Sequence, residues 1–91
     1  MESFAFVLEI QNKKGLHARA ASAFVKLTDQ FQSEIFVEKD GQRVSGRSIM
    51  GLMMLAAAQG TSIKVFVEGD DAVATKEAIS DLVNHKFFEE D

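Results

Sequence analysis

A histidine and an arginine lie close together near the start of the chain, in the segment Gly15-Leu16-His17-Ala18-Arg19. A neutral imidazole is a usable nucleophile at neutral pH and can carry a covalently bound group. The planar guanidinium of Arg19 presents several donors whose geometry suits phosphate oxygens. These residue types at this spacing indicate chemistry on an anionic group such as a phosphoryl group.

The segment that follows His17 has the hydrophobic spacing of a helix. Apolar positions recur at intervals of three and four from about residue 18, namely at Ala21, Phe24, Leu27, Thr28 and Phe31. His17 therefore lies where a loop meets a helix, beside first-turn N–H groups that lack intrahelical acceptors and favour an anion. We predict His17 as a phosphoryl acceptor, with Arg19 and the backbone of Ala18 and Arg19 as phosphate ligands. The residues alone leave open a plain surface or capping histidine.

The remaining pattern predicts the elements that must position this segment. Alternating hydrophobic residues predict strands over 4–10, 34–39, 42–45 and 62–68, with a hairpin turn at Asp40-Gly41. Ser48 is a candidate N-cap for a second helix, and Gly60 is placed to end it. A last helix follows the turn at Gly69-Asp70-Asp71 and has Lys86 near its end; its inward-facing residues are Ala72, Thr75, Ile79, Leu82 and Val83. The order β-α-β-β-α-β-α predicts an α+β sandwich with helices on one face of the sheet.

Composition narrows the class of protein. The 91 residues suffice for one domain, over 1–91, and 46% of them are hydrophobic. The absence of cysteine excludes disulfides and thiolate metal sites. No apolar run approaches the roughly 20 residues of a membrane span and no basic leader opens the chain, so we expect a cytoplasmic protein. The net charge of -4 argues against nucleic-acid binding. Basic residues nonetheless gather at Lys13, Lys14, Arg19 and Lys26, which suits an acidic partner, whereas Glu89, Glu90 and Asp91 end the sequence.

Two separated motifs carry a family resemblance. Gly15-Leu16-His17-Ala18-Arg19, followed further along by Ser48-Ile49-Met50-Gly51-Leu52-Met53, resembles the HPr family, the histidine-containing phosphocarriers of the bacterial phosphotransferase system. The resemblance runs over nearly the whole chain. It implies an open-faced β-sandwich, in which a four-stranded antiparallel sheet carries three helices on one face.

The resemblance also implies roles and partners. His17 matches the histidine phosphorylated at Nδ1, Arg19 the arginine beside it, and Ser48 the serine that HPr kinase/phosphorylase modifies in many members. Enzyme I, charged by phosphoenolpyruvate, would be the donor and IIA-type proteins the acceptors. We expect a carrier with no enzymatic activity of its own, no cofactor and no metal, and a monomer, because the histidine must be exposed to partners.

One position departs from the family pattern. Ala20 stands where the family usually has proline directly after the arginine. Proline is tolerated in the first turn of a helix, and alanine leaves one additional N–H donor there. The departure leaves open whether the chain belongs to the sugar branch or to the nitrogen-related (NPr-type) branch.

The second helix has two interpretations. Its apolar residues could all be buried, or Ile49, Met50 and Met53 could form an exposed docking patch, since methionine suits surfaces that fit several partners. The resemblance favours docking, with a basic rim from Lys26 and Arg47 and with Ser22 facing outward. Ser48 could be only an N-cap, or it could also be a regulatory phosphorylation site.

Three further interpretations complete the sequence-based picture. His85 is expected to be a solvated or capping residue, and a His17–His85 metal site lacks nearby carboxylate ligands. Phe87-Phe88 either covers a sheet edge or frays with the acidic tail. An HPr-like binding module that never transfers phosphate is a competing function, and so is an RNA-binding sheet, which requires exposed aromatic pairs in a basic surface.

Overall fold

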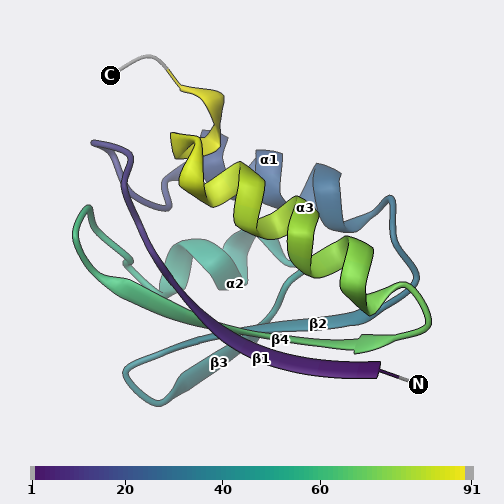
Figure 1. Ribbon diagram of the computed structural model, residues 1–91. Helices are drawn as coiled ribbons and strands as arrows, with labels where there is room; N and C mark the ends of the chain where they lie inside the picture. Colours follow the sequence, from purple (N-terminus) through teal and green to yellow (C-terminus); the bar gives the residue numbers. More distant parts are fainter. Residues whose placement is uncertain (1, 90–91) are drawn as a thin grey trace.

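The alternating segments form one antiparallel sheet of four strands in the order β1-β4-β2-β3 (Figure 1). The computed structural model describes residues 2–89, so Met1 and two residues of the predicted acidic tail, Glu90 and Asp91, lie outside the described residues. Strand β4 is central and pairs with both β1 and β2, which places Val65 opposite both Phe6 and Val37. The strand bounds are Glu2–Glu9 for β1, Glu34–Lys39 for β2, Gln42–Ser45 for β3 and Ser62–Gly69 for β4.

Three α-helices cover one face of this sheet (Figure 1). They are α1 (Ala18–Thr28), α2 (Ile49–Met54) and α3 (Ala72–Asn84), and a short 3-10 turn, η1 (Lys86–Phe88), follows α3. The predicted element order and the open-faced sandwich are confirmed. Among residues 2–89, no helix is both long enough and apolar enough to cross a membrane.

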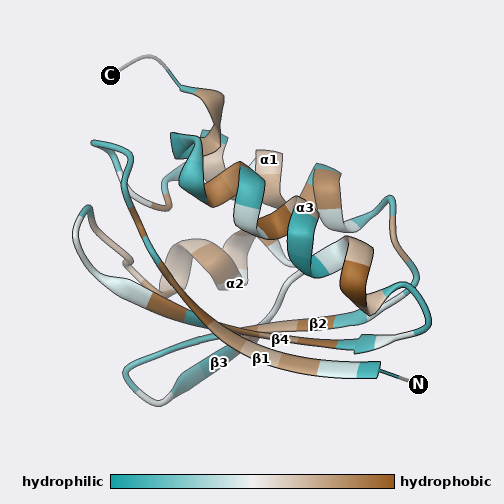
Figure 2. Ribbon diagram, viewed as in Figure 1, coloured by the Kyte–Doolittle hydropathy of each residue, from teal (hydrophilic) through white to brown (hydrophobic). Residues whose placement is uncertain are grey.

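The core lies between the sheet and the helices, and Figure 2 shows hydrophobic stretches along the strands and helices of both layers. Alternation along the strands turns every second side chain toward the helices. Helix α1 buries Ala21, Phe24 and Thr28 of the face that its three-and-four spacing predicts. Leu27 is only half-buried, and Phe31, also half-buried, lies beyond the end of the helix. The fully buried large side chains include Ile10, Phe24, Val37, Leu52, Ile63, Val65 and Ile79.

The outer face of the sheet carries two aromatic residues in register. Phe36 of β2 pairs with Phe66 of β4. The guanidinium carbon of Arg43 lies 4.6 Å from the centroid of the Phe36 ring and 4.3 Å from that of Phe66. Both rings are half-buried. Arg43 therefore contacts both rings of the pair through cation–π interactions.

The predicted end of the second helix was wrong. Helix α2 ends at Met54 rather than continuing to Gly60, and Ala56 adopts a left-handed φ of 51°. The chain leaves the helix early because the following loop forms backbone bonds elsewhere. The Ala57 carbonyl accepts from the Leu16 N–H at 2.9 Å, and the Gly60 N–H donates to the Ile10 carbonyl at 2.8 Å.

The start of α3 is tied to the end of the α1–β2 loop by Asp71. Its carboxylate accepts hydrogen bonds from the backbone N–H groups of Gln32 (2.7 Å) and Ser33 (3.0 Å) and from the Ser33 hydroxyl. The Ser33 hydroxyl and the Gln32 N–H are the main causes that lower the pKa of Asp71 below its ordinary value of 3.8.

Acidification is therefore expected to weaken the fold through Asp71. A lowered pKa in the folded state means that the unfolded chain binds the proton more readily. The stabilisation is complete above pH 3.8 and is lost as the pH falls through the lower pKa of the folded state. In Asp71→Asn, denaturant unfolding should show lower stability at pH 7 and a smaller further loss below pH 3.8 than in the parent. Parallel pH profiles for the two proteins would contradict this assignment.

Candidate functional site

His17 is the N-cap residue of α1. Its backbone is extended, with φ -84° and ψ -177°, and its carbonyl accepts the first helical hydrogen bond from the Ala21 N–H at 2.8 Å. The imidazole makes no capping bond to the helix, and 27% of its side chain is exposed. The histidine thus lies at the helix N-terminus, as the sequence predicts, with its ring partly open to solvent.

The loop before His17 is fixed by Gly15 and Leu16. Gly15 has a φ of +67°, and a Cβ added there would lie 2.4 Å from the carbonyl oxygen of Ala57. Only glycine allows this close approach together with a left-handed backbone. Leu16 is buried and donates its N–H to the same Ala57 carbonyl. The loop that follows α2 therefore sets the position at which α1 begins.

The first turn of α1 offers unpaired donors. Within the described part of the chain, the N–H groups of Ala18, Arg19 and Ala20 have no hydrogen-bond acceptor. No acidic residue occupies this turn. The Arg19 side chain is exposed and makes no hydrogen bond or ion pair with residues 2–89. Unpaired amides, the helix dipole and a guanidinium together favour an anion at this end of α1.

A second ionisable group contacts the histidine. Nε2 of His17 lies 2.6 Å from Oε2 of Glu89, and the other carboxylate oxygen accepts from Nδ2 of Asn12 at 2.9 Å. Asn12 is fully buried and also donates to the Gly15 carbonyl, while its own Oδ1 has no donor among the described residues. Sequence reasoning missed Asn12 and Glu89, because no local pattern links them to His17.

An unusual turn brings Glu89 to the site. Lys86, Phe87 and Phe88 all have φ values between 56° and 57°. Each left-handed residue other than glycine costs about 1–2 kcal/mol. Burial of Phe87, which joins the core, and stacking of Phe88 on the His85 ring at 5.2 Å help to offset this cost. Phe87 thus packs in the core while Phe88 is exposed, and the turn directs the following residue back to α1.

Two other predicted site residues, Ser48 and Arg47, make hydrogen bonds that stabilise the fold. Ser48 is the N-cap of α2, and its Oγ accepts from the Gly51 N–H at 2.9 Å. Arg47 donates to the carbonyl of Thr28, the last residue of α1, and to those of Phe31 and Ser33 in the loop before β2, at 2.7–3.0 Å. Neither finding tests a role in regulation or docking, which stays a prediction.

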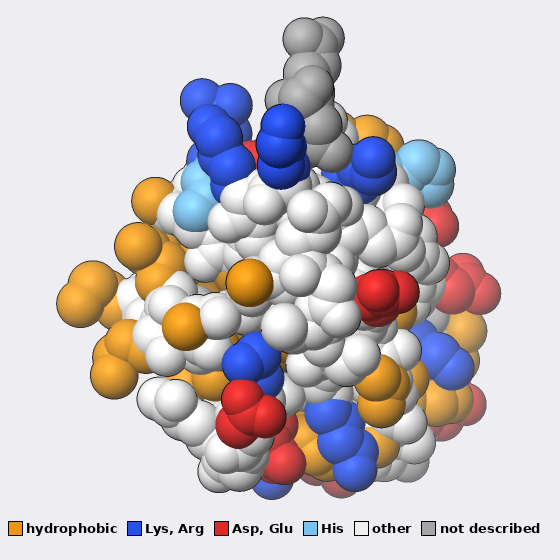
Figure 3. Space-filling view, turned by 90° about the vertical axis from the view of Figure 1, so that its left-hand side faces the viewer, with side chains coloured by type: hydrophobic (Ala, Val, Ile, Leu, Met, Phe, Trp, Pro, Cys, Tyr) orange, Lys and Arg blue, Asp and Glu red, His pale blue; other side chains and the backbone are white. Residues whose placement is uncertain are grey.

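The predicted docking residues lie on an exposed surface. The exposed fractions are 40% for Ile49, 73% for Met50 and 42% for Met53. Lys26 is exposed and Ser22 is half-buried. Figure 3 shows hydrophobic side chains gathered at one side of this face, below a group of basic side chains. Because the Ala57 carbonyl just after α2 bonds to Leu16, this surface adjoins the His17 loop.

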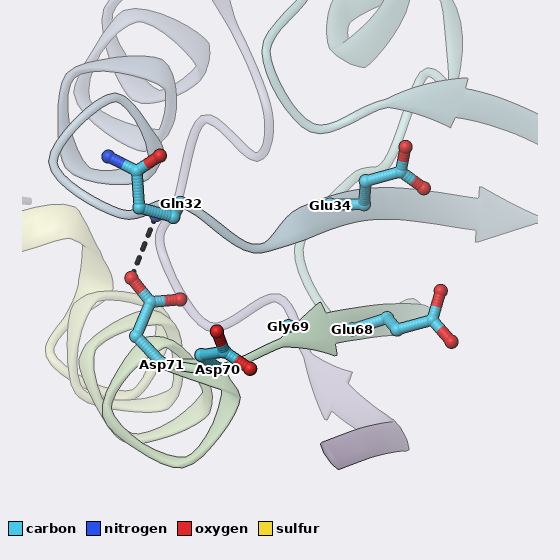
Figure 4. A pocket seen from close by; sticks show the side chains of 6 residues that line it. All are labelled: Gln32, Glu34, Glu68, Gly69, Asp70 and Asp71. Atoms are coloured by element: carbon cyan, nitrogen blue, oxygen red, sulfur yellow. Dashed lines mark hydrogen bonds between the residues drawn. The ribbon is translucent and has the colours of Figure 1, made fainter. Parts of the chain in front are cut away.

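A separate hollow of about 580 Å³ lies elsewhere on the molecule (Figure 4). It is lined by Gln32, Glu34, Glu68, Gly69, Asp70 and Asp71. Four carboxylates around one space repel a phosphate dianion, and neither His17 nor any basic side chain borders it. The hollow therefore does not compete with His17 as a phosphoryl site.

Comparison with known proteins agrees with this geometry. A family model described as the PTS HPr component phosphorylation site matches residues 5–85. The phosphocarrier protein HPr of Neisseria meningitidis serogroup A is 51% identical over 82 residues, which make up 90% of this chain and 92% of that protein. The HPr structure from Thermoanaerobacter tengcongensis has a TM-score of 0.90 and 46% identity, covering 96% of this chain and 98% of that one.

A relative with a different name has the same fold. Crh of Bacillus subtilis, a catabolite repression protein described as a dimer with a swapping domain, has a TM-score of 0.74 and 39% identity. The match covers 87% of this chain and 91% of Crh. Taken together, these matches show that the chain belongs to the HPr family of phosphocarrier proteins, as the sequence predicts.

Replacement of Gly15 tests how the loop positions His17. Gly15→Ala should lower the free energy of unfolding by about 3 kcal/mol, because it combines a left-handed backbone with a clash against the Ala57 carbonyl. Gly41→Ala is the matched control, since Gly41 also has a positive φ but has nothing within 4 Å of an added Cβ. This control should cost only about 1 kcal/mol. Equal losses in denaturant unfolding would show that the close approach is unimportant.

Proposed function

We propose that His17 accepts a phosphoryl group from enzyme I and passes it to a IIA-type protein. The observation that carries this proposal is the placement of a partly exposed imidazole at the N-cap of α1, next to amides without acceptors in residues 2–89. Membership of a phosphocarrier family supports the same reaction. The chain is a carrier that needs partner enzymes, and it takes no cofactor or metal.

The transfer requires little beyond placement and charge neutralisation. The lone pair of Nδ1 forms the new bond to phosphorus while the bond from phosphorus to the donor breaks. The amides of Ala18, Arg19 and Ala20 and the guanidinium of Arg19 stabilise the oxygens of the incoming group. Transfer to the acceptor reverses these steps.

Docking is proposed to use the exposed apolar surface of α2 together with the basic residues near it. Ile49, Met50 and Met53 would contact the partner, with Ser22, Lys26 and Arg47 around them. Enzyme I, IIA-type proteins and HPr kinase/phosphorylase are the proposed partners of a cytoplasmic monomer with one domain over 1–91. The carrier belongs either to the sugar branch or to the NPr-type branch. Measuring phosphoryl transfer to IIA-type proteins of each branch distinguishes the two.

Phosphorylation assays test the central claim. The purified chain incubated with phosphoenolpyruvate and enzyme I should gain an acid-labile, base-stable phosphate, because a phosphohistidine has that stability. His17→Ala should abolish the label, whereas His85→Ala should keep it, since the His85 ring bonds to the Asp81 carbonyl and stacks on Phe88 rather than bonding to His17. A parent protein without label would instead support a binding module that does not transfer phosphate.

Regulation through Ser48 is the second part of this proposal. A phosphate on Ser48 would lie at the start of α2, where negative charge is compatible with the fold. The same charge would lie within the docking surface and repel an acidic partner. Phosphorylation of Ser48 should therefore slow the charging of His17 without unfolding the protein.

Variants at Ser48 separate charge from capping. Ser48→Asp should lower the rate of enzyme I-dependent phosphorylation by about tenfold, the effect of roughly 1.4 kcal/mol of repulsion. Ser48→Asn is the matched control, because asparagine caps helices equally well without the charge. Both variants should retain the thermal unfolding midpoint of the parent to within a few degrees. Equal phosphorylation rates for the two variants would remove the regulatory role.

A further inference from the structure

The carboxylate of Glu89 is held firmly against one nitrogen of the histidine ring. Its side chain is only 9% exposed, and its two oxygens contact different partners, Nε2 of His17 at 2.6 Å and Nδ2 of Asn12 at 2.9 Å. Asn12 is in turn anchored by its bond to the Gly15 carbonyl. The loop before α1 and the turn after α3 therefore fix this carboxylate from two sides.

We propose that Glu89 is a positioning residue for phosphoryl transfer, which keeps the proton of His17 on Nε2 and leaves Nδ1 as the nucleophile. This inference rests on the proposed function. An ionised carboxylate can only accept hydrogen bonds, so the ring nitrogen that faces it must carry the hydrogen. A neutral imidazole has one such hydrogen, and the other nitrogen then has a free lone pair.

The same contact balances charge during the reaction. When Nδ1 bonds to phosphorus and the donor bond breaks, the ring keeps its hydrogen on Nε2 and becomes cationic. The Glu89 carboxylate then faces a positive ring, while the amides of α1 and Arg19 face the phosphoryl oxygens. After transfer to the acceptor, the ring is neutral again in the same tautomer. No proton needs to enter or leave the ring in either direction.

Two substitutions separate the hydrogen bond from the charge. Glu89→Gln retains an oxygen that can accept from Nε2–H, whereas Glu89→Ala removes both the acceptor and the charge. Glu77→Gln is the control, because Glu77 is an exposed carboxylate on α3 outside the site. The ring ¹⁵N chemical shifts of His17, recorded where the imidazole is neutral, report the tautomer directly.

The parent, Glu89→Gln and Glu77→Gln should show the Nε2–H tautomer, and Glu89→Ala should raise the Nδ1–H fraction several-fold. With enzyme I, Glu89→Ala should be phosphorylated about tenfold more slowly, as expected for loss of one charge-assisted hydrogen bond. For Glu89→Gln, the equilibrium constant for phosphoryl transfer from enzyme I to His17 should fall about tenfold, because the cationic ring of the phosphorylated histidine loses its counter-charge.

An unchanged tautomer ratio in Glu89→Ala overturns the role of Glu89, whatever the parent protein does with phosphate. So does a phosphorylation rate in Glu89→Ala equal to that of Glu77→Gln. A parent protein that takes up no phosphate contradicts the proposed function instead, and the tautomer measurement on unphosphorylated protein distinguishes that failure from the first.

Discussion

The candidate site depends on the unpaired backbone N–H groups at the start of α1. A helix N-terminus normally satisfies some of its N–H groups with a capping side chain. Here the N-cap residue is His17, whose side chain makes no hydrogen bond to the helix. The N–H groups of Ala18, Arg19 and Ala20 therefore have no acceptor among the described residues. Ala18 and Arg19 are exposed, so this end of the helix can receive an anion from outside the protein.

Two segments far apart in the sequence keep this end of the helix in place. In the loop after α2, the Ala57 carbonyl accepts a hydrogen bond from the Leu16 N–H. The turn after α3 brings the Glu89 carboxylate to Nε2 of His17. Neither segment belongs to a regular element at the point of contact. Both segments contain residues with a left-handed backbone, Ala56 in the first and Lys86 to Phe88 in the second. This conformation costs free energy, which packing of the surrounding buried side chains must offset.

Local sequence signals predicted the framework well and the contacts of the site less well. The alternation in each strand, the Asp40-Gly41 turn and the three-and-four spacing after His17 each reflect a preference that acts over a few residues. The end of α2 was misplaced because Ala56, rather than a glycine, adopts the left-handed conformation that follows the helix. The Glu89–His17 contact joins residues separated by 72 positions through a left-handed turn without glycine, and no sequence pattern marks such a turn. The sequence around Arg47 likewise does not indicate that its guanidinium binds three backbone carbonyls at the end of α1 and in the loop that follows.

The route of the polypeptide after α3 has a practical consequence for anyone who prepares this protein. Only two residues, Glu90 and Asp91, would separate an affinity tag fused after Asp91 from a side chain that touches the His17 imidazole. Such a fusion could pull on η1 or crowd the ring, and it would then change the property being measured. The beginning of β1 lies at the opposite end of the molecule (Figure 1). Purification handles therefore belong at the amino terminus, or they should be cleaved off before any activity is recorded.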